Sequence, residues 1–218
     1  MTRPARPDGA LEIVLASANE HKAREIREIV AGLTRGQGGP DIELLDRPSG
    51  LGDVEETGST LLDNARLKAD AVMQATGRPA IADDTGLEVA ALGGVPGVHS
   101  ARYAGPSADA RANTAKLLDA LERAERDAHG SNRRARFRTV VVVVFPDRSE
   151  LVAEGIVDGS IARAPRGSAG FGYDAVFEPD GGGGQTFAEL GDEAKHALSH
   201  RGRALASLLG SLAGRATR

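Results

Sequence analysis

The run Phe137–Phe145, which contains five consecutive valines, constrains the fold more than any other part of this chain. β-Branched residues favour extended strands, and a strand without polar alternation must be covered on both of its faces. Such a strand belongs in the middle of a sheet that has other elements packed above and below it. We therefore expect a layered fold with Phe137–Phe145 as an inner strand.

The segments around this run alternate between strand and helix patterns. The turn residues Pro146–Ser149 separate it from Glu150–Val157, which predicts a β-hairpin. Helical spacing of apolar residues predicts helices over His21–Leu33, from Ser59 or Thr60 to about Thr76, over Ala108–Asp127, and from Ser199 to about Leu212. Short strands are expected at Leu11–Ala16, Ile42–Leu45, Ala80–Ala82 and Asp174–Phe177, and loops at Gly36–Pro40 and Gly181–Gly184. This interleaving predicts a mixed α/β fold.

The composition is that of an ordinary globular protein, with 218 residues and a formal net charge of −4. This charge gives no general attraction to DNA or RNA, and the absence of cysteine excludes disulfides, thiolate metal sites and cysteine nucleophiles. No apolar run approaches the roughly 20 residues of a membrane span, so we expect a cytoplasmic protein without membrane or nucleic-acid partners. Residues 1–10 are expected to be a flexible extension, 11–213 a single domain and 214–218 a tail.

The stretch Ala80–Gly86 places two adjacent carboxylates, Asp83 and Asp84, directly after a short apolar run. If Ala80–Ala82 is a buried strand, both acids stand at its carboxyl end, where Gly86 allows the chain to turn. Ligands bind at that edge in open α/β sheets, and Mg²⁺ is commonly held by one or two carboxylates together with substrate phosphates. The alternative is an acidic turn that binds nothing.

A second candidate site is Ser17–Lys22, which lies between an expected strand and an expected helix. A helix start presents backbone N–H groups and the positive end of the helix dipole, and both favour an anion. Lys22 in the first turn opposes the dipole, so its position suits an anionic ligand. Phosphate binding and a plain capped helix are the two interpretations.

Further polar residues cluster around the next helix. Glu55 and Glu56 precede it, and within it Asn64 and Lys68 are four residues apart, so these two share one helix face. Such a polar edge faces either solvent or a cleft.

The segment Gly167–Asp174 interleaves glycines with Phe171 and Tyr173 in a chain that is only 3% aromatic. Glycine lets the backbone approach a ligand closely, an aromatic ring can stack on a base, and Asp174 can accept hydrogen bonds. The alternative is a tight turn with Phe171 buried. Three potential cations lie around the expected start of the last helix, in a segment that would otherwise be a solvated cap: Lys195, His200 and Arg201.

In this order, these motifs resemble the inosine triphosphate pyrophosphatase family over Leu11 to about Leu212. The matching segments are Ser17-x-Asn19-x-x-Lys22, Glu55-Glu56-Thr57-Gly58, Asn64-Ala65-x-x-Lys68-Ala69, Ile81–Leu87, Gly93–Tyr103, Gly170–Asp174 and the loosely spaced Lys195, His200 and Arg201. Ala175 departs from the proline that the family pattern has after the aspartate. The resemblance implies Mg²⁺-dependent hydrolysis of ITP, dITP or XTP at the α-phosphorus, which releases the monophosphate and pyrophosphate.

The resemblance also implies roles for individual residues. Asp84 would activate the water and share the Mg²⁺ with Glu56, and Phe171 would stack on the purine. The other substrate-binding residues would be Ser17, Ala18, Asn19, Glu20, His21, Lys22, Lys68, Thr85, Gly172, Tyr173, Asp174, Lys195, His200 and Arg201. The implied architecture is an elongated, twisted mixed sheet flanked by helices, with two lobes around a central active-site cleft, in a homodimer.

Base choice would follow from hydrogen-bond polarity, because a 6-oxopurine accepts at O6 and donates at N1 whereas adenine reverses both. Four other functions remain as alternatives. A Maf-like nucleotide pyrophosphatase is disfavoured by Asn19 and Lys22, and a non-catalytic nucleotide sensor is disfavoured by Glu56 and Asp84. An RNA-binding module is disfavoured by the negative net charge. Release of the γ-phosphate instead of pyrophosphate stays open.

Overall fold

The structure is a computed structural model that describes residues 10–35, 41–127 and 132–216. Its strands are β1 (Leu11–Leu15), β2 (Ile42–Leu45), β3 (Ala80–Val89), β4 (Pro96–Gly97), β5 (Arg134–Val144), β6 (Glu150–Ile161) and β7 (Phe177–Pro179). Its α-helices are α1 (Glu20–Thr34), α2 (Leu61–Thr76), α3 (Ala110–Asp127), α4 (Asp192–Leu198) and α5 (His200–Ala216). The expected extension over residues 1–10 and the expected loop Gly36–Pro40 lie, apart from Ala10, outside the described residues.

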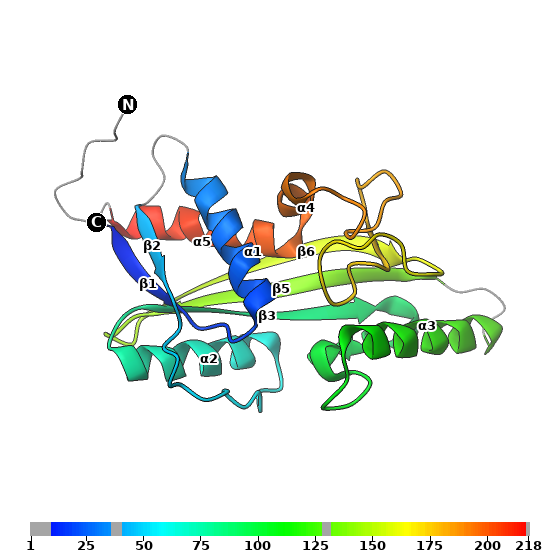
Figure 1. Ribbon diagram of the computed structural model, residues 1–218, viewed down its shortest axis with the longest axis horizontal. Helices are drawn as coiled ribbons and strands as arrows, with labels where there is room; N and C mark the ends of the chain where they lie inside the picture. The colour runs from blue at the N-terminus through cyan, green and yellow to red at the C-terminus, as the bar shows by residue number, and fades with distance from the viewer. Residues whose placement is uncertain (1–9, 36–40, 128–131, 217–218) are drawn as a thin grey trace. The chain divides into compact units, whose positions relative to one another are not determined.

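In the described part of the chain the strands form one seven-stranded sheet of order β2-β1-β3-β5-β6-β7, with β4 paired to β3 (Figure 1). β1 runs parallel to β2 and β3, whereas the pairs β3–β4 and β6–β7 are antiparallel. The predicted mixed α/β class is confirmed. The predicted hairpin is also present, because β5 and β6 are neighbours joined across Pro146–Ser149.

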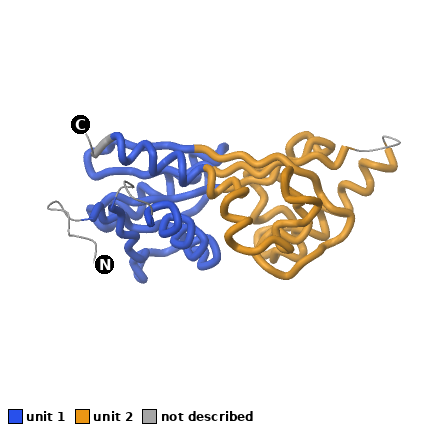
Figure 2. The backbone as a smooth tube through the Cα atoms, turned by 90° about the horizontal axis from the view of Figure 1, so that it is seen from above, with its two compact units in different colours: residues 1–84, 140–153, 204–218 blue, residues 85–139, 154–203 orange. Residues whose placement is uncertain are grey.

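The chain divides into two compact units, which Figure 2 colours separately. Unit 1 comprises residues 1–84, 140–153 and 204–218, and unit 2 comprises residues 85–139 and 154–203. β3, β5 and β6 each contribute residues to both units.

The core of unit 1 explains the run of valines. Val141 and Val143 pack in one cluster with apolar residues of β1, α1 and α5. Val140, Val142 and Val144 are buried as well and alternate to the opposite face of the strand. On that side lies α2, whose buried side chains include Ala65, Ala69 and Val72 (Figure 1). The strand is therefore covered on both faces, as predicted.

The core of unit 2 is built around aromatic side chains. Phe137 of β5, Phe177 of β7 and Phe187 pack together, with Phe137 and Phe177 meeting edge to face at 4.7 Å between ring centroids. Leu117 and Leu121 of α3 complete this cluster. The alternating burial of β5 before its valines follows from this, since only one face of that part meets the cluster.

The helix α2 begins where the sequence predicts. Thr60 is the N-cap, and its side chain accepts from the backbone N–H of Asp63 while the Asp63 side chain accepts from the Thr60 N–H. This reciprocal pair is a capping box. Gly77 ends the helix in the left-handed conformation, with φ of 66°.

The prediction that β3 ends at Asp83 and Asp84 is wrong, because the strand continues to Val89. The neighbouring strand β1, however, does end near the two acids. Its last residues, Val14 and Leu15, pair with Ala80 and Ile81 of β3. Gly86 does not turn the chain. A Cβ at this position would lie 2.8 Å from the carbonyl oxygen of Gly97 in the paired strand β4, so glycine permits a close backbone approach.

Two further boundaries differ from the predictions. The segment before Phe177 is a turn, closed by N–H groups of Asp174 and Val176 that donate to the carbonyls of Phe171 and Tyr173, and the strand β7 begins only at Phe177. The short helix α4 precedes the last helix, so Lys195 lies on α4 and not on α5. α5 reaches Ala216, into the expected tail.

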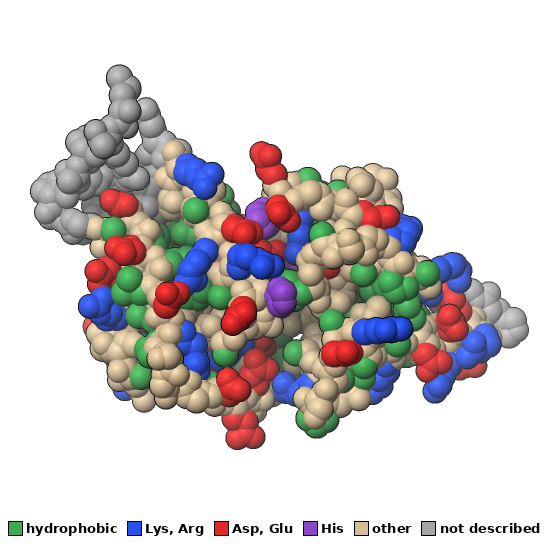
Figure 3. Space-filling model, in the orientation of Figure 1, with side chains coloured by type: hydrophobic (Ala, Val, Ile, Leu, Met, Phe, Trp, Pro, Cys, Tyr) green, Lys and Arg blue, Asp and Glu red, His purple; other side chains and the backbone are tan. Residues whose placement is uncertain are grey.

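The face of the molecule in Figure 3 carries intermixed acidic and basic side chains. Local ion pairs of the described residues include Arg134 with Asp180 and Arg66 with Glu150. Among the described residues, no helix combines the length and the apolar character that a membrane crossing requires.

Candidate active site

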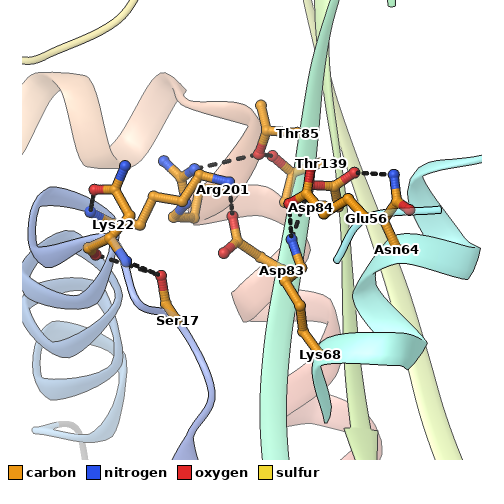
Figure 4. Close-up of polar contacts among 11 residues, drawn as sticks. Ser17, Lys22, Glu56, Asn64, Lys68, Asp83, Asp84, Thr85, Thr139 and Arg201 are labelled. Atoms are coloured by element: carbon orange, nitrogen blue, oxygen red, sulfur yellow. Dashed lines mark hydrogen bonds and ion pairs between the residues drawn. The ribbon is translucent and has the colours of Figure 1, made fainter. Parts of the chain in front are cut away.

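Unit 1 gathers two carboxylates around one ammonium group. Lys68 Nζ of α2 lies 2.9 Å from Asp84 Oδ1 of β3 and 3.1 Å from Glu56 Oε1 of the preceding loop (Figure 4). Asp84 is buried, at 5% exposure, and the side chain of Lys68 is 14% exposed. The predicted metal-binding pair, Glu56 and Asp84, is thus brought together on a single cation.

Asn64 extends this cluster. It is fully buried, and its Nδ2 donates to Asp84 Oδ2 over 3.3 Å while its Oδ1 accepts from the Gly58 N–H at 2.8 Å. The polar face shared by Asn64 and Lys68 therefore points at Asp84. The sequence indicated this face, but it did not place Asn64 among the site residues.

Burial and charge act in opposite directions on the two central groups. Burial raises the pKa of the Asp84 carboxyl, the charges of Lys68 and Lys22 lower it, and the pKa stays above its ordinary value. Burial lowers the pKa of the Lys68 ammonium, but the charges of Asp84, Asp83 and Glu56 outweigh it and hold the pKa above the ordinary value. Lys68 therefore stays charged, and Asp84 binds a proton more readily than an exposed aspartate.

The turn between β1 and α1 lies beside the same strand. Asn19 caps α1, because its side chain accepts from the backbone N–H of Lys22 at 3.1 Å. The hydroxyl of Ser17 lies 3.3 Å from both the N–H and the carbonyl oxygen of Asn19. Lys22 Nζ reaches Asp83 Oδ2 at 3.6 Å. The predicted cap and the predicted basic first turn are both present.

The remaining residues of this turn are accessible. Ala18, Glu20 and His21 are exposed, and His21 lies 3.3 Å from the guanidinium of Arg24. Backbone N–H groups at the exposed start of the 15-residue helix α1 and the partly buried ammonium of Lys22 thus form a positive end. An anion is the ligand that such an end favours.

Unit 2 contains a second polar cluster, around Asp174. Its Oδ2 accepts from the Phe171 N–H at 2.8 Å and from Lys195 Nζ at 2.9 Å, and both Asp174 and Lys195 are buried. Gly170 has φ of 74°, and a Cβ there would lie 2.2 Å from Asp174 Oδ2. The glycine is therefore required both by the backbone conformation and by the carboxylate.

Phe171 lies beside two cations. Its ring centroid is 5.3 Å from Lys195 Nζ and 5.7 Å from the guanidinium carbon of Arg201. The ring is half-buried, unlike the fully buried phenylalanines of the unit 2 core. Arg201 Nη2 also donates to Thr85 Oγ1 at 3.2 Å. One part of unit 2 thus brings together Phe171, Lys195, Arg201 and Thr85. Gly172 lies next to Phe171 in the same backbone turn.

Two of the predicted site residues, Tyr173 and His200, are buried and also make contacts in the core. Tyr173 is buried, and its hydroxyl donates to the Ser100 carbonyl at 2.9 Å; burial raises the pKa of this phenol. The ring of His200 stacks on Phe137, with 4.5 Å between centroids. These contacts join segments far apart in the sequence, so spacing alone could not reveal them.

No group of three or more His, Asp or Glu side chains within residues 10–35, 41–127 and 132–216 is arranged to hold a metal ion by itself. The carboxylates of Glu56 and Asp84 nevertheless converge on one point, now taken by the ammonium of Lys68. Because Mg²⁺ is typically held by one or two carboxylates together with phosphate oxygens, the donor set fits Mg²⁺ that arrives with a phosphate ligand.

Comparison with known proteins identifies the family. The sequence pattern of the Ham1 family matches residues 13–211. A dITP/XTP pyrophosphatase of Thermus thermophilus is 48% identical over 200 residues, which are 91% of this chain and 90% of the relative. A dITP/XTP pyrophosphatase of Thioalkalivibrio sulfidiphilus is 46% identical over 94% of this chain and 100% of the relative. The solved structure of a HAM1 protein from Coxiella burnetii has a TM-score of 0.78 and 41% identity, covering 95% of this chain and 98% of its own. The chain belongs to the Ham1 family.

Proposed function

We propose that this protein hydrolyses non-standard purine nucleoside triphosphates, namely dITP, XTP and ITP, to the monophosphate and pyrophosphate, and that it uses Mg²⁺. The observation that carries the proposal is the convergence of Glu56 and Asp84 on Lys68, in a chain whose relatives include dITP/XTP pyrophosphatases. Removal of such triphosphates would keep deaminated purines out of DNA and RNA.

The triphosphate would bind at the start of α1 and beside Lys68. Backbone N–H groups of the Ser17–Lys22 turn and the ammonium of Lys22 supply donors and positive charge for phosphate oxygens. Lys68 adds a second ammonium, which would exchange part of its contact with the carboxylates for phosphate.

Glu56 and Asp84 would hold Mg²⁺ together with phosphate oxygens. When bound there, the ion would neutralise phosphate charge and lower the pKa of a coordinated water. Asp84 would accept the proton of the water that attacks the α-phosphorus, and the hydrogen bond from Asn64 would fix the orientation of its carboxylate.

The purine would stack on the ring of Phe171. Donors from Arg201 and backbone N–H groups match O6 of a 6-oxopurine, and carboxylate or carbonyl oxygens match its N1–H. Adenine would leave these buried groups without partners, which discriminates strongly against ATP. Exclusion of GTP would then rest on its 2-amino group. The family resemblance further implies a homodimer in the cytoplasm, and both remain predictions.

A product assay with the Asp84→Asn variant tests this function. Purified protein with Mg²⁺ is given dITP, XTP, ITP, ATP and GTP separately, and the phosphate products are identified. We expect pyrophosphate from the first three, with little turnover of ATP and GTP. In Asp84→Asn we expect a kcat about 10²–10⁴-fold lower, because the proton acceptor is lost, while dITP still binds.

Asp70→Asn is the matched control, since Asp70 lies on α2 next to Arg148 and outside the Glu56–Lys68–Asp84 cluster. If the products were orthophosphate and a nucleoside diphosphate, the γ-phosphate would be the group released, and the proposed attack at the α-phosphorus would be wrong. Binding of dITP without turnover would support a nucleotide sensor, and full activity of Asp84→Asn would remove Asp84 from its role.

A further inference from the structure

We propose that Thr139 is a positioning residue for purine recognition, which acts through Thr85 on the guanidinium of Arg201. The inference rests on the proposed function, because it assigns Arg201 to the recognition of the base. Thr139 itself would not touch the substrate.

A line of hydrogen bonds connects these residues within unit 2. Thr139 Oγ1 of β5 lies 2.7 Å from Thr85 Oγ1 of the neighbouring strand β3. Thr85 Oγ1 in turn accepts from Arg201 Nη2 at 3.2 Å (Figure 4). Thr139 is fully buried and Arg201 is 2% exposed. The guanidinium of Arg201 is therefore hydrogen-bonded to Thr85 of the sheet, and Thr85 is in turn hydrogen-bonded to Thr139.

The identity of residue 139 argues for the hydroxyl group. Residue 139 is followed directly by the valines 140–144, and at this inner-strand position a valine would occupy nearly the same volume as a threonine. A buried hydroxyl destabilises the fold unless it is hydrogen-bonded. Valine would fill the space at position 139, so the hydrogen bond to Thr85 explains why the residue there carries a hydroxyl.

The bond fixes more than one side chain. β-Branched Thr85 has few χ1 rotamers, and its hydroxyl is held from one side by Thr139 and from the other by Arg201. The guanidinium presents its N–H donors as a rigid planar fork, so one fixed acceptor orients the whole group. Arg201 also lies 5.7 Å from the ring of Phe171, the proposed stacking partner of the purine. Loss of the Thr139 hydroxyl would therefore loosen the donors around the base.

The variants Thr139→Val and Thr139→Ser separate the hydroxyl from the volume of the side chain. We would measure kcat and KM for dITP and for dATP with both variants and the wild type, because adenine carries a donor where a 6-oxopurine carries the O6 acceptor. In Thr139→Val we expect the ratio of kcat/KM for dITP to that for dATP to fall about tenfold, mainly through a higher KM for dITP, as loss of one hydrogen bond predicts. Thr139→Ser, which keeps the hydroxyl, should stay near the wild-type ratio.

Thr76→Val is the matched control. This variant also removes a hydroxyl that donates a hydrogen bond, in this case to the Val72 carbonyl. Thr76 is the last residue of α2 and lies at the other end of the helix from Asn64. Thr139→Ala gives the same readout if the valine variant does not fold. An unchanged dITP-to-dATP ratio in an active Thr139→Val variant would overturn the inference, as would a loss that is equal for both substrates and is not restored by serine. A wild-type protein that does not hydrolyse dITP would instead overturn the proposed function.

Discussion

Lys68 is the side chain on which most of the unit 1 site depends. Its ammonium contacts both carboxylates, and its charge is the strongest influence that lowers the pKa of Asp84 against the effect of burial. In the metal-free protein the Asp84 carboxyl should therefore bind a proton at a higher pH than an exposed aspartate does.

Lys68→Gln should raise the pH at which Asp84 binds its proton. Without the ammonium, burial is opposed by less positive charge, so the pKa of Asp84 rises further above its ordinary value. The measurement is a carboxyl-carbon NMR titration of the protein without Mg²⁺ and without nucleotide. Lys116→Gln, on α3 of unit 2, is the control and should keep the wild-type titration of Asp84. An unshifted Asp84 titration in Lys68→Gln would contradict this role of Lys68.

The sequence predicted site residues best where local spacing decides their position. The caps Asn19 and Thr60 and the shared face of Asn64 and Lys68 are set by neighbours within one or two helical turns. Tyr173 could not be separated from Phe171 in the same way. Its burial depends on the Ser100 carbonyl, 73 residues away in the chain, which no local pattern reveals.

Among the elements, β3 shows what the local pattern misses. Aspartate and glycine are poor strand formers, so Asp83, Asp84 and Gly86 read as the end of a strand. Tertiary contacts override that preference: Leu87 is paired with Gly97 of β4, and its N–H also donates to the hydroxyl oxygen of Ser100 at 2.8 Å. The break between α4 and α5 is similar, since a Cβ at Gly202 would lie 2.0 Å from the His196 carbonyl.

Gly86→Ala tests the close approach within the sheet. The added Cβ would meet the Gly97 carbonyl oxygen at 2.8 Å, and because that atom is backbone, β4 must shift. We expect a loss of about 1–3 kcal/mol in the free energy of unfolding, measured by urea titration. Gly32→Ala in α1, where no atom lies within 4 Å of the new Cβ, should instead gain about 0.5–1 kcal/mol. A Gly86→Ala variant as stable as the wild type would contradict the account.

At the scale of the whole molecule, one sheet supports two hydrophobic cores. β3, β5 and β6 pass from one compact unit into the other without a break in the strand. A unit that unfolded alone would have to disrupt strands that the other unit also uses. We therefore propose that residues 11–213 unfold as a single cooperative domain.

Leu208→Ala in unit 1 and Leu121→Ala in unit 2 test this cooperativity. Both leucines are fully buried, so each variant should lose about 2–5 kcal/mol of stability. Scanning calorimetry should show one transition, shifted to lower temperature as a whole in either variant. Two transitions, of which each variant shifts only one, would instead describe two independent domains.

The ammonium between Glu56 and Asp84 has a consequence for the protein in a cell. Its positive charge is part of the chain, so the two carboxylates have a counter-charge at all times. The folded state then has no need of a resident ion to offset their repulsion. With Mg²⁺ as the proposed cofactor, we expect a shortage of the ion to slow turnover and to leave the amount of folded protein unchanged, so that activity returns as soon as the ion does, without new synthesis.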